Sequence, residues 1–210
     1  MAVTDAPAKA RALCNARRTG VPIPPFIDED PTLGIADGYA IPLSRFIQPK
    51  IEAEIAFVLG ERLAGPGVTV TDARRSIAGA AAAMEIVDSR IENWRIKLAD
   101  TVADLASNGA AATSSRIVPI DGLDTRLVGM TLTRNGELVD TGAGAAALGD
   151  PVAVVAWLAN VLGENGVALE PGHIVLTGAL HAAVPMHAGD VFRADFDRLG
   201  PVTVRVTEGA

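Results

Sequence analysis

Apolar and polar side chains alternate most clearly just after Lys50. The stretch IEAEIAFVLG, residues 51–60, alternates for six residues, continues as an apolar run and ends at Gly60. Alternation with a period of two is typical of a β-strand, and a glycine after an apolar run marks a turn. We therefore predict a strand here, with Glu52 and Glu54 on one face and apolar side chains on the other.

Three further segments carry a helical period or a helix start signal. Thr71 or Asp72 is expected to cap a helix over residues 73–82. Residues 92–107 space their large apolar side chains along one broad helical face. The stretch PVAVVAWLANVL, residues 151–162, has proline in its first turn, where the missing N–H leaves no helical bond unmade. The pattern thus predicts three helices in this part of the chain.

The first 46 residues have a different character. Residues 1–20 are rich in Ala, Lys and Arg and predict a helix that Thr19 and Gly20 end. The stretch VPIPPFIDEDP, residues 21–31, contains four prolines, which exclude a helix interior and a central strand. We interpret it as an extended, ordered linker. Residues 1–46 are therefore predicted to form an N-terminal helical arm, separate from a main domain over residues 47–210.

Strand signals dominate the second half of the chain. The run MEIVDSRI, residues 84–91, predicts a buried strand, and Asn135-Gly136 is the strongest short signal for a β-hairpin. Three more strands are predicted at HIVLTG, DVFRADF and PVTVRV, residues 173–178, 190–196 and 201–206. Strands grouped together with few helices favour an α+β fold, built on a mixed, rolled β-sheet with flanking helices.

Composition narrows the classes of partner. The net charge is −7 and the basic residues are scattered, so the sequence has no basic stripe of the kind that binds nucleic acid. The longest apolar stretches are too short or too rich in alanine to predict a membrane span, and no secretory signal opens the chain. Cys14 is the single cysteine, which excludes an internal disulfide. We expect a soluble cytoplasmic protein that binds neither nucleic acid nor membrane.

Three glutamates form the candidate chemical site. Glu52 and Glu54 project from the same face of a strand, about 6–7 Å apart. Glu85 interrupts the apolar strand MEIVD, where an unpaired carboxylate would be costly to bury. A hard divalent cation would relieve the repulsion between such carboxylates and prefers oxygen ligands. The alternative is that Glu52 and Glu54 face water and that Glu85 pairs with an arginine.

Four segments resemble a known family, in the order in which they occur. They are QPKIEAEIAFVLG, MEIVDSRIENWRIKLADTVADLAS, TGAGAAALGDPVAVVAWLANVLGENGVALEPGHIVLTGAL and GDVFRADFDRLGPVTVRV. Together they resemble the 2-keto-4-pentenoate hydratase family of the fumarylacetoacetate hydrolase superfamily, which also includes 2-oxohept-3-ene-1,7-dioate hydratases and 4-oxalocrotonate decarboxylases. The resemblance runs from about Ile47 to the C-terminus, and a weaker similarity is found at IADGYAIP.

The resemblance implies a metal-dependent active site. The Mg²⁺ or Mn²⁺ ligands of the family match Glu52, Glu54 and Glu85, and its turn near the substrate matches Thr177 and Gly178. It implies a hydratase of a 2-hydroxy-2,4-dienoate in the degradation of aromatic compounds, with a 4-hydroxy-2-oxo acid as product. We expect a homo-oligomer whose partner is this small acid.

The sequence also predicts the pairing or the exposure of several other side chains. Asp88 and Arg90 are expected to pair and to orient Glu85. Asp104 is expected on a solvated helix face. His181 and His187 are expected at the surface, because a spacing of six residues fits no usual metal site.

One family segment is missing. Between the IADGYAIP segment and the strand at Ile51, the family carries a longer insert with a G-x-K-x-G-L-[ST]-S motif, whose lysine is thought to contact substrate. The chain has three lysines, Lys9, Lys50 and Lys97, and none lies in that motif. Two alternatives to the hydratase therefore stay open: a decarboxylase of the 4-oxalocrotonate type, and a metal-binding homologue without catalytic activity.

Overall fold

The computed structural model describes Thr19 and residues 40–208. The predicted N-terminal helix, the proline-rich linker and Cys14 lie outside the described residues. The division between an arm and a main domain at residue 47 therefore stays a prediction.

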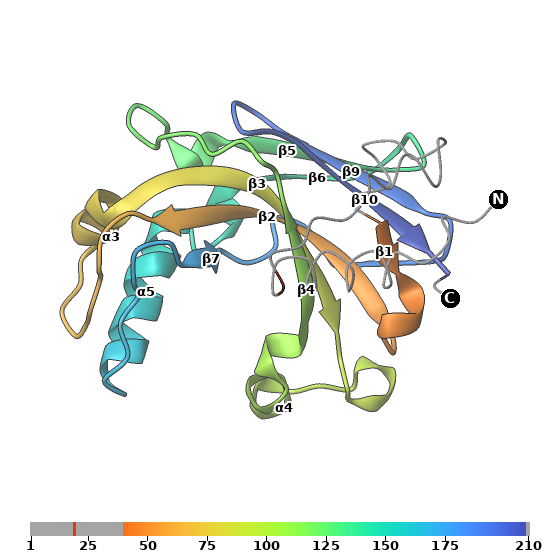
Figure 1. The fold of residues 1–210 in the computed structure, drawn as a ribbon, viewed down its shortest axis with the longest axis horizontal. Helices are drawn as coiled ribbons and strands as arrows, with labels where there is room; N and C mark the ends of the chain where they lie inside the picture. The colour runs from red at the N-terminus through yellow and green to blue at the C-terminus, as the bar shows by residue number, and fades with distance from the viewer. Residues whose placement is uncertain (1–18, 20–39, 209–210) are drawn as a thin grey trace.

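Two five-stranded sheets form the body of the protein (Figure 1). The first has the order β1-β10-β9-β5-β6, with strands Ala40–Pro42, Gly200–Thr207, Val191–Phe196, Gly129–Arg134 and Glu137–Ala143. The second has the order β4-β3-β2-β7, with strands Asn108–Thr113, Ile77–Asp88, Pro49–Leu59 and Ile174–Leu176, and β8 (Val184–Pro185) also pairs with β2. Only β1 and β10 run parallel among the strand pairs of the described residues. The mixed-sheet α+β prediction is confirmed.

The hydrophobic core lies between these sheets. Strand β2 contributes Ile51, Ala53, Ile55 and Phe57, all fully buried, which is the apolar face that the alternating sequence predicts. The first sheet contributes buried side chains to the same cluster, namely Met130, Leu132, Phe192, Ala194, Val202, Val204 and Val206. Because successive residues of a strand point to opposite faces, this packing turns the even-numbered residues of β2 away from the core.

The helix predicted over residues 73–82 is wrong. The helix α3 (Val70–Ser76) begins earlier, after Thr69, whose hydroxyl accepts from the Asp72 N–H in a capping box. From Ile77 onward the alanine-rich stretch forms β3 and pairs with β2 along its whole length. Tertiary pairing thus overrides the helical propensity of alanine.

The single long helix predicted over residues 92–107 is also wrong. Three short helices take its place: the 3-10 helix η3 (Glu92–Trp94), the α-helix α4 (Leu98–Ala103) and the 3-10 helix η4 (Leu105–Ser107). Positive φ angles interrupt the segment at Asn93, Trp94 and throughout η4. Its apolar side chains do not form a core face, since Leu98, Val102 and Leu105 are 80%, 68% and 77% exposed. The segment forms a lobe that projects from the sheet between β3 and β4 (Figure 1).

The remaining predictions for the second half are confirmed. Asn135 and Gly136 connect β5 and β6 with φ angles of 55° and 86°, as a tight hairpin turn requires. The helix α5 (Pro151–Gly163) is capped by Asp150, whose carboxylate accepts from the Val152 N–H. Strands β7 and β9 fall within the predicted runs, and β10 extends its predicted run by one residue at each end. Short turns η2 (Leu43–Arg45), η5 (Thr125–Leu127) and η6 (Gly144–Ala146) complete the elements.

Among the residues that the structure describes, one segment is apolar and long enough, by composition, to cross a membrane: Gly144–Gly163. In the fold it is divided into η6, a turn and α5, because Leu148 and Gly149 have positive φ angles. One side of α5 packs in the core through Val152, Val155 and Ala159.

Gly144 provides a test of this packing. A Cβ atom there would overlap the carbonyl oxygen of Thr125 and lie 3.2 Å from Cδ1 of Ile55. Gly144→Ala should therefore lower the free energy of unfolding by about 1–3 kcal/mol, as overpacking of a core does. Urea unfolding measures the change. Gly129→Ala is the control, because a Cβ there meets nothing within 4 Å. Equal stability of the two variants would contradict the packing described.

Candidate metal centre

The pairing of β2 with β3 brings the three predicted glutamates together. Glu52 and Glu85 are direct partners in the antiparallel register, so their side chains lie on the same face of the sheet. Glu54 follows two residues later on that face. One carboxylate oxygen from each residue lies within 4.8 Å of the other two. The sheet thus forces three acidic groups into one small volume.

This proximity has an electrostatic cost. Glu54 is 1% exposed, and burial, together with the negative charge of Glu85, raises its pKa to about 8. The pKa of Glu52 is also raised, first by burial and then by Glu85, while the charge of Lys50 lowers it. Three ionised carboxylates at this separation repel one another strongly. A divalent cation among them would offset the repulsion, and carboxylate oxygens are its preferred ligands. The donor set therefore fits a hard divalent cation.

The segment after β7 supplies a hydrogen-bond donor to this cluster. The Gly178 N–H donates to Oε2 of Glu54 at 2.8 Å, which lowers the pKa of Glu54 against the larger effects that raise it. Gly178 has φ +96°, a conformation that favours glycine. The Thr177 hydroxyl is buried and donates to the Ile55 carbonyl at 2.9 Å. Thr177 thus anchors the turn to β2, and a substrate contact of Thr177 and Gly178 stays a prediction.

His181 contacts the backbone of β2 between Glu52 and Glu54, and its predicted surface position is wrong. Its side chain is fully buried, and its Nε2 accepts from the Ala53 N–H at 2.8 Å. Nδ1 lies 2.6 Å from the Ala182 carbonyl oxygen, so it carries the ring proton and donates there. Ala53 lies between the residues of β2 that pair with β7 and those that pair with β8, and the imidazole accepts its N–H there. His187 is 70% exposed, as predicted. No local pattern distinguishes His181 from His187, because the role of His181 depends on the path of the chain.

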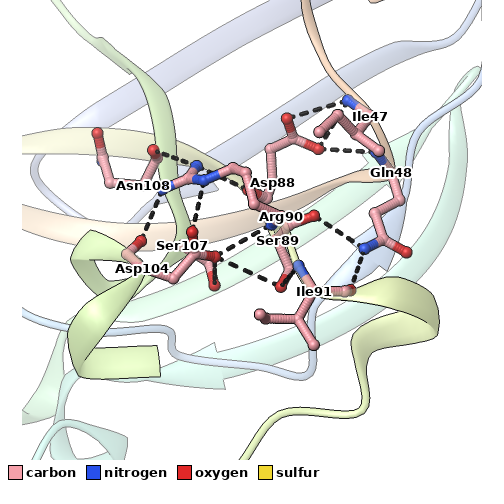
Figure 2. Close-up of polar contacts among 9 residues, drawn as sticks. All are labelled: Ile47, Gln48, Asp88, Ser89, Arg90, Ile91, Asp104, Ser107 and Asn108. Carbon is pink, nitrogen blue, oxygen red and sulfur yellow. Dashed lines mark hydrogen bonds and ion pairs between the residues drawn. The ribbon is translucent and has the colours of Figure 1, made fainter. Parts of the chain in front are cut away.

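The predicted pairing of the Asp88 and Arg90 side chains is not made, and Arg90 reaches only the backbone carbonyl of Asp88. The Asp88 carboxylate accepts from the backbone N–H groups of Ile47 and Gln48. Arg90 instead pairs with Asp104, with Nε 2.6 Å from Oδ1 (Figure 2). The Asp104 side chain is only 9% exposed, so its predicted solvated position is also wrong. Glu85 is contacted by a residue that sequence reasoning missed, Asn108, whose Nδ2 donates to Oε1 at 2.5 Å.

Lys50 borders the same face of β2. It lies two residues before Glu52, and its ammonium group is 4.2 Å from the centroid of the Trp94 ring. The Trp94 indole N–H donates to the Gln48 carbonyl at 3.0 Å, which fixes the ring. Both side chains line a hollow of about 580 Å³, together with Phe46 and Met186. Glu208 also lines this hollow, but no carboxylate of the described residues lies within 4.0 Å of the Lys50 ammonium.

The mixed sheets and the acidic centre define the class of protein. The sequence profile described as "Fumarylacetoacetate (FAA) hydrolase C-terminal" matches residues 7–207, and the chain belongs to this family of enzymes. Within it, the chain is 43% identical over 186 residues to a 2-keto-4-pentenoate hydratase of Paraburkholderia xenovorans (strain LB400), covering 89% of this chain and 69% of that one. The family resemblance predicted from the sequence is confirmed.

Other relatives carry related names. A 2-hydroxyhexa-2,4-dienoate hydratase of Comamonas testosteroni is 41% identical over 174 residues, covering 82% of this chain and 66% of that one. The solved structure of 4-oxalocrotonate decarboxylase from Pseudomonas putida G7, complexed with magnesium and adipate, superposes with a TM-score of 0.76. It is 38% identical and covers 81% of this chain and 67% of that one. This chain is thus shorter than the relatives that it matches.

Ionisation of Glu54 gives a test of the centre. Because its pKa is raised from 4.5 to about 8, its contribution to stability is present below pH 4.5 and is lost as pH rises through 8. Glu54→Gln should therefore raise the thermal midpoint of metal-free protein at pH 8.5 and change it little at pH 5. Differential scanning calorimetry in EDTA measures both values. The exposed Glu137→Gln is the control, and identical pH profiles for the two variants would refute the buried cluster.

Proposed function

We propose that this protein is a divalent-metal-dependent hydratase that converts a 2-hydroxy-2,4-dienoate into a 4-hydroxy-2-oxo acid. The observation that carries the proposal is the convergence of Glu52, Glu54 and Glu85 within 4.8 Å in a fold of the fumarylacetoacetate hydrolase family. The names of the relatives support the reaction, since several are hydratases of 2-keto-4-pentenoate or 2-hydroxyhexa-2,4-dienoate. The resulting role is a step in the degradation of aromatic compounds.

Glu52, Glu54 and Glu85 would hold Mg²⁺ or Mn²⁺. When bound, such a cation polarises the oxygen at C2 of the substrate and stabilises negative charge there. The contribution of the chain is to hold the carboxylates in place: the strand pairing fixes Glu52 opposite Glu85, and the Gly178 N–H orients Glu54. Burial of Glu54 keeps water away from one side of the site.

Lys50 is the cation that we assign to the carboxylate of the substrate. Its side chain leaves β2 on the same face as Glu52, and Trp94 limits its motion through a cation–π contact. The family lysine motif is absent from this chain, so this ammonium group offers the charge that an acidic substrate needs beside an acidic cluster. A fixed ammonium group stabilises a carboxylate through a charge-assisted hydrogen bond.

Two alternatives are each favoured by one observation. A decarboxylase of the 4-oxalocrotonate type is favoured by the solved structure with a TM-score of 0.76. A metal-binding homologue without activity is favoured by the missing lysine motif. For the hydratase and for both alternatives, we propose a homo-oligomer in the cytoplasm. In this oligomer a second copy covers the exposed Leu98, Val102 and Leu105.

A direct assay separates these functions. Purified protein with Mg²⁺ and 2-hydroxypenta-2,4-dienoate should consume the dienoate absorbance and form 4-hydroxy-2-oxopentanoate, which mass spectrometry identifies. Glu52→Ala should lower kcat/KM at least about 100-fold, because it removes a metal ligand, whereas the exposed Glu137→Ala should not. Release of CO₂ from 4-oxalocrotonate without hydration would favour the decarboxylase. A metal-dependent rise in Tm with neither reaction would favour the homologue without activity.

Lys50→Met tests the assigned carboxylate contact. Removal of one charge-assisted hydrogen bond, about 1.5–3 kcal/mol, should lower kcat/KM by about 10- to 100-fold, mainly through a higher KM. Lys97→Met is the matched control, because Lys97 is an exposed lysine on the projecting lobe. Steady-state kinetics measure both variants. An unchanged KM for Lys50→Met would remove Lys50 from the site.

A further inference from the structure

We propose that Asn108 is a positioning residue that holds Glu85 in the orientation needed to bind a metal ion, and that the Arg90–Asp104 pair sets the place of Asn108. This inference rests on the proposed metal-binding role of Glu85. Its starting point is the hydrogen bond from Nδ2 of Asn108 to Oε1 of Glu85.

A β-bulge brings Asn108 to the correct face of the sheet. From Ala83 to Ile86, the residues of β3 and β4 pair one to one, from Ala83 opposite Thr113 to Ile86 opposite Ala110. The register then shifts, and Val87 faces Asn108 rather than Gly109. A shift of one residue moves a side chain to the other face. Asn108 therefore lies on the face of Val87, which is also the face of Glu85.

Gly109 makes this bulge possible. A Cβ atom at Gly109 would lie 3.0 Å from the Ile86 carbonyl oxygen, 3.1 Å from the Phe46 ring and 3.2 Å from Cβ of Asp88. These contacts are tight on three sides, so a larger residue would push the start of β4 away from β3. The close approach keeps Asn108 within reach of Glu85.

The guanidinium group of Arg90 fixes the backbone beside Asn108. Its Nη1 donates to the carbonyl oxygens of Asp88 at 2.8 Å and of Asn108 at 3.2 Å. Its Nε and Nη2 donate to Oδ1 and to the carbonyl oxygen of Asp104, both at 2.6 Å (Figure 2). The Ser107 hydroxyl also donates to the Asp104 carboxylate, at 3.2 Å. The two ends of the projecting lobe are thus closed against each other directly before Asn108.

The Asn108 side chain itself has little part in the folding of the described residues. It is exposed, and its hydrogen bond within the described chain goes to Glu85. An amide N–H donor restrains a carboxylate without adding charge to the cluster, which suits a group that supports a metal ligand. Loss of the amide should therefore affect metal affinity much more than stability.

Titration with Mn²⁺, followed by electron paramagnetic resonance, tests the role of Asn108. Asn108→Ala should raise the Kd for Mn²⁺ by about 10- to 100-fold, the usual effect of removing a group that orients a ligand. The Tm of the metal-free protein should match that of the wild type. Asn165→Ala is the control, because Asn165 is an exposed asparagine that bonds to the Val161 carbonyl at the end of α5.

The outcomes for Asn108 separate two failures. If the wild type binds Mn²⁺ and Asn108→Ala binds it equally well, the positioning role is refuted and the proposed function stands. If the wild type binds no Mn²⁺, the metal-binding proposal itself fails, and this inference fails with it.

A double-mutant cycle tests the contribution of Arg90. Arg90→Ala should weaken Mn²⁺ binding in the wild-type background but cause no further loss in the Asn108→Ala background, because both act through one hydrogen bond to Glu85. Arg126→Ala removes an exposed arginine paired with Asp124 and serves as the control. Additive losses from Arg90→Ala and Asn108→Ala would show that Arg90 does not act through Asn108, which would overturn this part of the inference.

Discussion

The repulsion between carboxylates that β2 and β3 bring together is the constraint around which this structure is organised. Glu52 and Glu85 are direct cross-strand partners, and Glu54 is buried beside them. An antiparallel pair of strands normally avoids like charges in this position. The apolar packing of β2 in the core keeps the strand in this register despite the cost, because a slip of one residue would exchange its buried and polar faces.

Segments outside the regular strand pairing supply hydrogen bonds that the sheet itself does not make. Three irregular segments reach this cluster or the edge of β2 beside it: the turn after β7 with the Gly178 N–H, the segment before β8 with His181, and the bulge at the start of β4 with Asn108. Each leaves regular strand geometry, so that the Gly178 and Asn108 donors reach a carboxylate and the His181 ring accepts from the edge of β2. The departures from regular structure therefore lie where the candidate chemistry lies.

The projecting lobe shows how local patterns can mislead. Its apolar residues repeat with a helical period, yet Leu98, Val102 and Leu105 are exposed and the backbone is broken by positive φ angles. The lobe is held by the Arg90–Asp104 pair and by the contact of Trp94 with Lys50 rather than by a buried helix face. A hydrophobic period predicts a buried face only where another element packs against it, and no element of the described residues covers this one.

The sequence by itself determined the strand at β2, the hairpin at Asn135 and the helix that begins at Pro151, because each depends on residues close together in the chain. The three glutamates were candidates from their strands and from the family resemblance, and the pairing of β2 with β3 brings them together. The tertiary structure alone decided that residues 77–83 form a strand, that His181 is buried and that Asn108 rather than Asp88 contacts Glu85. These outcomes depend on strand register, on a bulge and on partners distant in sequence, and local propensity carries no information about them.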